Sequence, residues 1–118
     1  MDQGQQVRDA RQDDPISAVA KQAEWARVVE RNGRVVGSIC MNRINPVDGS
    51  PPGVWIYDVS SEGDDPNDAA VLMKAAFRQA KEWGLAHNVR ANVTNMKLLA
   101  KAIKRGFAIE AYIIKGEI

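Results

Sequence analysis

Residues that could carry chemistry gather between positions 54 and 84 of this sequence. Tyr57 and Asp58 stand in a run rich in β-branched and aromatic side chains, and a carboxylate such as Asp58 could act as a general base. Because side chains alternate between the two faces of a strand, only one of these two residues can face a given cleft. The alternative interpretation of Asp58, a solvent-facing carboxylate near a strand end, is the one that the sequence favours.

An acidic helix start follows this run. Asp65 is a natural N-cap, Pro66 suits the first helical position, and apolar residues then recur at steps of three and four as far as Trp83. Such a helix start favours a bound anion, but here Asp64, Asp65 and Asp68 supply negative charge themselves. A carboxylate about 4 Å from a phosphate costs about 4 kcal/mol at an effective dielectric constant of about 20. The sequence therefore predicts a helix that caps itself rather than one that binds a phosphate.

The other reactive side chains lack partners at a recognisable spacing. His87 is the one histidine and Cys40 the one cysteine, so we expect no metal site and no internal disulfide. We predict a solvated loop histidine and a small buried thiol. Trp25, Trp55 and Trp83 fall on apolar faces and are interpreted as core or interface residues.

The elements that must position these residues begin with a strand–loop–helix–strand order. Residues 54–59 predict a strand, 60–65 a polar loop, and 66–83 a helix that Gly84 ends as a C′ residue. A second strand is predicted over 89–94. Such a unit joins two parallel strands through a right-handed crossover.

The clearest local signal is a hairpin over residues 25–41. Asn32 and Gly33 are the pair favoured in a two-residue type I′ turn. Both strands carry apolar residues on both faces, so we expect the sheet to be covered on both sides in a three-layer α/β/α arrangement. The turn predicts the pairs Glu30–Val35, Val28–Gly37, Ala26–Ile39, Val29–Val36 and Trp25–Cys40.

The outer parts of the chain differ in character. Residues 1–14 are polar and charged, and we expect an arm that precedes a domain spanning residues 15–118. A weak helical period follows this arm and predicts a short helix. Near the end, Asn95 predicts a helix start, Gly106 its end, and residues 107–115 a final strand.

Composition places the chain among ordinary soluble domains. It has 118 residues, 45% apolar and 26% charged side chains, and a net charge of +1, which suits one core and no second domain. A charge so close to zero gives no global attraction to nucleic acid or membranes. No apolar run approaches the roughly 18 residues of a spanning helix. We expect a reducing, cytoplasmic location.

The order of these elements resembles the GNAT N-acetyltransferase superfamily, with ERNGRVVGS in the hairpin and VRANVTNMKLLAKAIKRGFAIEAYII towards the end. The resemblance covers roughly residue 25 to the C-terminus. It implies an α/β fold of one domain, with a mixed central sheet flanked by helices. Because no N-terminal first strand is evident, we expect a GNAT-like fold that is shortened at the N-terminus.

The resemblance also implies a cofactor. In that family acetyl-CoA lies between the fourth and fifth strands, and its pyrophosphate is held at the start of the third helix by a Gln/Arg-x-x-Gly-x-Gly/Ala loop. The matching segment here is 64–69, of which only Ala69 fits the pattern. If acetyl-CoA binds, the resemblance implies Val59, Ser60, Ala69 and Asn95 as its contacts; otherwise we expect no cofactor.

The catalytic residues of the family are matched poorly. A tyrosine in the fourth helix, five residues before the Phe of Gly-Phe, often acts as the general acid, and Ala102 stands there in this sequence. Tyr112 could replace it, although a tyrosine on a sheet face is more often simply packed. A working enzyme would be an N-acetyltransferase with Asp58 and Tyr112 as its candidate catalytic residues.

Two classes of function remain open. The first is a GNAT-like protein without acyl-CoA chemistry, a binding or structural component that resembles acetyltransferase-like proteins encoded by tailed bacteriophages, some of them packaged in the virion. It would lie in the host cytoplasm or the virion and would bind a protein partner, a larger assembly or further copies of itself. The second is an acetyl-CoA-dependent N-acetyltransferase with a divergent pyrophosphate loop that uses the backbone of residues 60–63. The acidic helix start favours the first class.

A basic stripe on the predicted last helix is a candidate partner surface. It consists of Lys97, Lys101, Lys104 and Arg105. Cations near a helix C-terminus also stabilise the helix as a solvated face. Because four cations on one domain bind nucleic acid only weakly, we do not expect a nucleic-acid partner.

Overall fold

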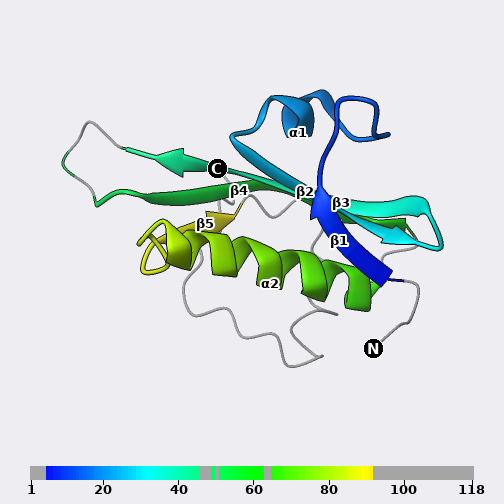
Figure 1. Cartoon of the computed structure of the whole chain (residues 1–118). Coiled ribbons are helices and arrows are strands. Elements are labelled where there is room, and N and C mark those ends of the chain that lie inside the picture. The colour runs from blue at the N-terminus through cyan, green and yellow to red at the C-terminus, as the bar shows by residue number, and fades with distance from the viewer. Residues whose placement is uncertain (1–4, 46–48, 50, 63–64, 92–118) are drawn as a thin grey trace, which may run out of the picture.

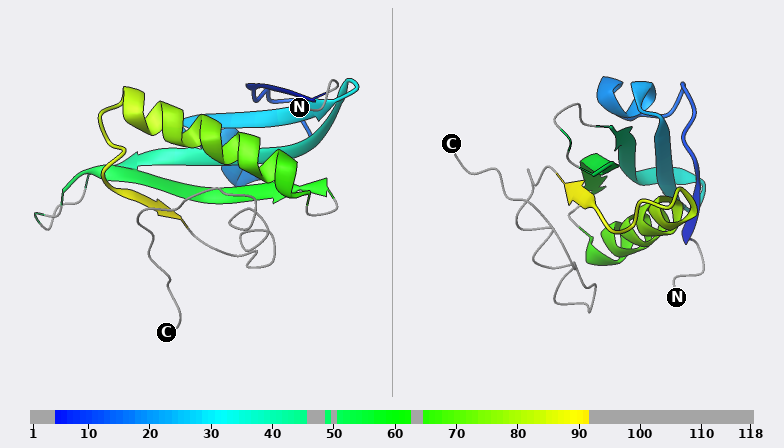
Figure 2. Two further views of the ribbon diagram at one scale, coloured as in Figure 1. Left: turned by 90° about the horizontal axis from the view of Figure 1, so that it is seen from below. Right: turned by 90° about the vertical axis from the view of Figure 1, so that its left-hand side faces the viewer.

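The computed structural model describes residues 5–45, 49, 51–62 and 65–91, which form one mixed sheet and two helices. The strands lie in the order β1-β2-β3-β4-β5; β1 to β4 pair antiparallel, and β4 and β5 pair parallel. Figure 1 shows α1 on one face of the sheet and α2 on the other, and both views in Figure 2 agree. The elements are β1 (Gln5–Asp9), α1 (Ala18–Gln22), β2 (Trp25–Arg31), β3 (Arg34–Ile44), β4 (Gly53–Ser61), α2 (Pro66–Glu82) and β5 (Val89–Ala91).

The predicted hairpin is present, with a different register. Asn32 and Gly33 have φ values of 54° and 79°, as a type I′ turn requires, and Glu30 pairs with Val35. An irregularity between Val29 and Glu30 then shifts the pairing by one residue. The other four predicted pairs are therefore wrong, and the structure instead has Val29–Gly37, Val28–Ser38, Ala26–Cys40 and Trp25–Met41.

The sheet buries side chains on both faces, as the two apolar faces of the hairpin predicted. In β3 the six consecutive residues 36–41 are buried. The main core lies between the sheet and α2, where Ile39, Met41 and Leu72 are fully buried. Val28 and Cys40 alternate to the opposite face and are also fully buried.

The expected N-terminal arm is wrong for residues 5–14. Residues 5–9 form β1, which pairs with β2 from Gln5–Arg31 to Asp9–Arg27, so the first strand that the sequence did not reveal is present. The strand has one apolar residue, Val7, and lies at the edge of the sheet. Hydrogen bonds and ion pairs hold it in place of apolar burial, as shown by Arg8, which donates to Asp14 at 2.8 and 3.0 Å and to Glu30 at 2.6 Å.

The strand–helix–strand unit agrees with its prediction. Asp65 is the N-cap of α2, Pro66 opens the helix, and Gly84 follows it with φ 76°. Val54 pairs with Val89 in the parallel register of β4 and β5. Within the described residues, neither helix is long and apolar enough to cross a membrane. The predicted last helix and last strand, residues 95–115, lie outside the described residues.

Candidate functional site

The start of α2 caps itself, as the sequence predicted for Asp65. The Asp65 carboxylate accepts a hydrogen bond from the Asn67 N–H at 2.9 Å, and the Ser61 hydroxyl accepts one from the Asp65 N–H at 3.0 Å. Pro66 has no N–H to offer. Two backbone positions that could donate to a phosphate at this helix start are therefore not available. The Asn67 N–H already donates to Asp65, and Pro66 has no N–H. Asp64 lies outside the described residues.

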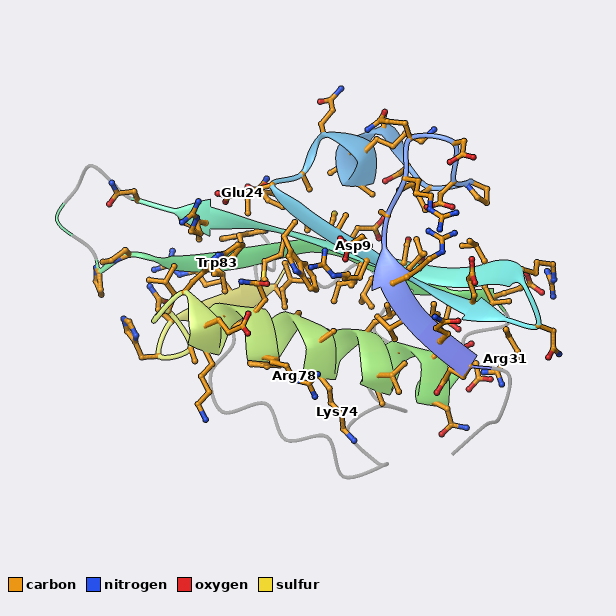
Figure 3. All side chains as sticks on the ribbon, in the orientation of Figure 1. Asp9, Glu24, Arg31, Lys74, Arg78 and Trp83 are labelled. Carbon is orange, nitrogen blue, oxygen red and sulfur yellow. The ribbon has the colours of Figure 1, made fainter. Side chains whose placement is uncertain are left out.

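Asp68 has a role that the sequence did not reveal. Its carboxylate is 2% exposed and accepts hydrogen bonds from Arg31 at 2.5 Å and from Gln5 at 2.7 Å. A second carboxylate oxygen, from Asp65, lies 3.8 Å from the same Arg31 guanidinium. Figure 3 shows Arg31 where β1 passes the start of α2. Asp68 therefore ties α2 to β1 and β2, and Arg31 offsets part of the negative charge at the helix start.

Asp58 lies on β4 opposite Cys40, in a position that differs from the expected solvent-facing strand end. Its side chain is half-buried, and β4 continues for three residues beyond it. Burial first, and then the charge of Asp58, raise the pKa of the Cys40 thiol to about 11. The thiol is therefore protonated near neutral pH, and Cys40 is the small core residue that was predicted.

Tyr57 does not alternate simply with Asp58, because the pairing of β3 with β4 shifts between Cys40 and Met41 and leaves Tyr57 unpaired. Its side chain is exposed, and its ring lies 6.1 Å from the ring of Trp55. An exposed tyrosine therefore stands next to Asp58 in β4.

The residues proposed to contact acetyl-CoA divide into two groups. Val59 packs partly against the core, Ala69 is buried, and the Ser60 hydroxyl lies 3.2 Å from the hydroxyl of Ser38. These three side chains are thus engaged within the domain. The Ala69 N–H also donates to the Asp65 carbonyl oxygen at 3.2 Å, and Val59 and Ser60 pair with Ile39 and Ser38 of β3. The other candidates, Asn95, Ala102, Tyr112 and the basic stripe of Lys97, Lys101, Lys104 and Arg105, lie outside the described residues.

His87 is exposed in the turn after α2, as predicted. Trp25 is buried, and Trp55 and Trp83 are half-buried. Arginine side chains lie over two of these rings, with Arg27 4.7 Å from the Trp25 ring and Arg43 4.8 Å from the Trp83 ring. The tryptophans are therefore packed side chains, as the sequence analysis interpreted them.

A pocket that the sequence analysis missed lies between β1, β2 and α2. This β1–α2 pocket has a volume of about 450 Å³. Its position depended on β1, which the sequence did not reveal. The one available signal was the spacing of Lys74 and Arg78, four residues apart on the polar side of a helix. The residues that matter most in its lining are Val7, Trp25, Arg27, Val71, Lys74 and Arg78.

Comparisons with known proteins identify the fold. No protein-family profile and no curated protein matches the sequence. Solved structures of aminoglycoside acetyltransferases do match. The enzyme meta-AAC0020 from an uncultured soil metagenomic sample, in complex with trehalose, has 12% identity and a TM-score of 0.67 over 99% of this chain and 93% of its own.

Two further structures agree with that match. The same enzyme in complex with sisomicin has 16% identity and a TM-score of 0.58 over 80% of this chain and 60% of its own. The aminoglycoside N-acetyltransferase AAC(6')-Iy in complex with CoA has 16% identity and a TM-score of 0.57 over 84% of this chain and 70% of its own. The chain therefore has a GNAT-like acetyltransferase fold, a single α/β domain with a mixed central sheet.

Proposed function

We propose that this protein is a GNAT-like domain that has lost acyl-CoA chemistry and works as a binding or structural component. The observation that carries the proposal is the Asp65 carboxylate, which accepts from the Asn67 N–H at 2.9 Å. A cofactor pyrophosphate at this helix start would have to displace that carboxylate and would find no N–H on Pro66. The partner would be a protein or a larger assembly, for which a bacteriophage particle is one candidate on the resemblance given above.

An acetyl-CoA-dependent N-acetyltransferase is the second candidate. The structural neighbours favour it, since they are acetyltransferases and one of them is bound to CoA. The Arg31–Asp68 pair favours it too, because an offset carboxylate repels a phosphate less than a free one. In this case acetyl-CoA would use the backbone near Val59, Ser60 and Ala69, and Asp58 would be the candidate base.

Thermal unfolding with and without acetyl-CoA separates the two candidates. A ligand present at a hundred times its Kd adds about 2.7 kcal/mol to the free energy of unfolding, which raises the Tm of a domain of this size by several degrees. We expect no rise in Tm with 1 mM acetyl-CoA or CoA. A saturable rise would contradict the loss of acyl-CoA chemistry.

A second measurement tests catalysis itself. Release of the free CoA thiol would be followed with acetyl-CoA and a panel of amines, including an aminoglycoside. We expect no release above the uncatalysed rate. Release that depends on enzyme concentration and falls in Asp58→Asn, while Glu62→Gln just after the end of β4 leaves it unchanged, would establish the second candidate instead.

A further inference from the structure

We propose that the β1–α2 pocket binds a small organic anion with an apolar body. The pocket lies between the edge strand β1, strand β2 and the outer side of α2. Its volume of about 450 Å³ falls in the range of small-molecule sites. The site does not involve the start of α2 or strand β4, so it is independent of the function proposed above.

The apolar part of the pocket comes from three elements. Val7 of β1 and Val71 and Ala75 of α2 line it, and all three pack partly against the core. Trp25 of β2 lines it as well and is itself 6% exposed. A ligand body that contacts these side chains would leave water for an apolar surface.

The charges at the pocket favour an anion. Lys74 and Arg78 are exposed, lie one helical turn apart, and form no ion pair within the described residues. Figure 3 shows both side chains extending from the same side of α2. Like charges at this spacing repel one another, so an anion between them relieves a repulsion that the free protein carries.

The other charged groups that line the pocket are largely offset. Arg8 is paired with Asp14 and Glu30, and the Arg27 guanidinium lies 3.1 Å from Asp9. Glu82 is the remaining carboxylate in the lining. Lys74, Arg78 and Glu82 together leave one positive charge at the rim, whereas Arg8 with its two carboxylates leaves one negative charge. An anion would therefore be held by its closeness to Lys74 and Arg78 and not by a net positive charge of the whole lining.

The side chain of Trp25, which lines the pocket, has a buried indole N–H. Its nitrogen is buried and has no hydrogen-bond acceptor within the described residues. A buried N–H without an acceptor is rare in folded proteins, because it loses its hydrogen bond to water on folding. Because this nitrogen is buried, its N–H could reach a ligand carboxylate only if the indole ring moved. Lys74 and Arg78 would therefore be the groups that hold the charge of the ligand.

The test follows the indole N–H signals of the full chain by NMR while phenylacetate is added. Three tryptophans give three such signals, and the variant Trp25→Phe assigns the one that belongs to the pocket. We expect a saturable shift of the Trp25 signal and little change at Trp55 and Trp83. Phenylacetamide, a neutral probe of nearly the same shape, and acetate, which lacks the apolar body, are expected to bind at least about fivefold more weakly.

Charge variants make the test specific to the pocket. In the double variant Lys74→Gln and Arg78→Gln we expect about a five- to tenfold loss of phenylacetate affinity, and a similar weakening of the wild type in 0.5 M salt. Lys81→Gln is the matched control, since Lys81 is an exposed lysine on α2 that does not line the pocket. Its affinity should equal that of the wild type.

Three results would overturn the proposal. They are no saturable shift of the Trp25 signal, equal binding of phenylacetate and phenylacetamide, and unchanged affinity in the double variant. Each leaves the outcome with acetyl-CoA unaffected, because that ligand would occupy a different part of the domain.

Discussion

The two halves of α2 treat charge in opposite ways. At its start, the carboxylates of Asp65 and Asp68 are both used within the protein, one on the Asn67 N–H and the other on Arg31 and Gln5. Along its second half, Lys74 and Arg78 have no ion-pair partner within the described residues. The first half of the helix is therefore stabilised by its own charges, and the second half carries charges that a ligand could use.

This difference bears on where the domain could bind an anion. Helix starts attract anions in general. At the start of α2, however, the Asn67 N–H already donates to the Asp65 carboxylate. The β1–α2 pocket instead has two cations, Lys74 and Arg78, that form no ion pair with any residue that the structure describes. A domain with a GNAT-like fold would thus have its free anion-binding groups on the opposite edge of the sheet from the β4–β5 pair.

The largest expected effect is at the first half of α2, where the carboxylates have partners within the protein. Asp68→Ala should lower the free energy of unfolding by about 3–5 kcal/mol, because it leaves Arg31 partly buried without its nearest carboxylate. Asp68→Asn, which keeps an oxygen acceptor for Gln5, should lose less. Urea unfolding of both variants and the wild type measures the difference. A loss below about 1 kcal/mol in Asp68→Ala would place this pair among ordinary surface ion pairs.

The second prediction concerns how stability changes with pH through the Arg8–Asp14 pair. The hydrogen bond from Arg8 is the main reason that the pKa of Asp14 lies below its ordinary value. Between the lowered pKa and the ordinary one, the unfolded chain binds a proton that the folded chain does not, so this stabilisation is present at neutral pH and is lost as the pH falls. Asp14→Asn should therefore lower the free energy of unfolding by about 1.5–3 kcal/mol at pH 7.

The difference in the free energy of unfolding between the wild type and Asp14→Asn should become steadily smaller below about pH 4, near the ordinary pKa of an aspartate. Urea unfolding at several pH values between 7 and 3 measures it. A difference in unfolding free energy that stays constant with pH would mean that the negative charge of Asp14 does not stabilise the domain through its pair with Arg8.

The third prediction is at the helix cap. Asp65→Ala should lower the free energy of unfolding by about 1 kcal/mol, because the Asn67 N–H loses its acceptor. Asp65→Asn, which can still accept from that N–H, should lose a few tenths. If both variants were as stable as the wild type, the start of α2 would not depend on its own carboxylate, and the argument against a bound pyrophosphate would weaken.

The features that sequence predicted well are local ones. The turn at Asn32 and Gly33 and the start of α2 at Asp65 and Pro66 follow from the backbone preferences of neighbouring residues. The fold class followed from the order of such elements. The self-capped helix start, which decides the proposed function, was predictable for the same reason.

The features that were missed depend on contacts between distant residues. Strand β1 is polar, and its partners Glu30, Arg31 and Asp68 lie more than twenty residues away along the chain. The shifted register of the hairpin places Gly37 beneath α2, where an added Cβ would lie 2.7 Å from the Ser60 carbonyl oxygen and 3.4 Å from Leu72. Neither fact can be seen in the hairpin sequence alone, and the β1–α2 pocket required both β1 and the register.

The smallest expected effect is at the second half of α2, which carries Lys74 and Arg78. Lys74→Gln should raise the free energy of unfolding by about 0.2–0.5 kcal/mol, because Arg78 is the one charged residue a helical turn away and the two cations repel. Lys81→Gln should change it in the other direction, since Lys81 lies in the last turn, where the helix dipole favours a cation.

Lysine and glutamine have similar helix propensities, so propensity does not explain a difference of opposite sign between these two variants. Urea midpoints at low salt and in 0.5 M salt would measure it, and both effects should shrink at high salt. If Lys74→Gln were destabilising at low salt, Lys74 would already have an anionic partner within the protein. The charge of Lys74 would then already be used within the protein, as the charges of Asp65 and Asp68 are. The β1–α2 pocket would lose a cation on which the binding of its ligand depends.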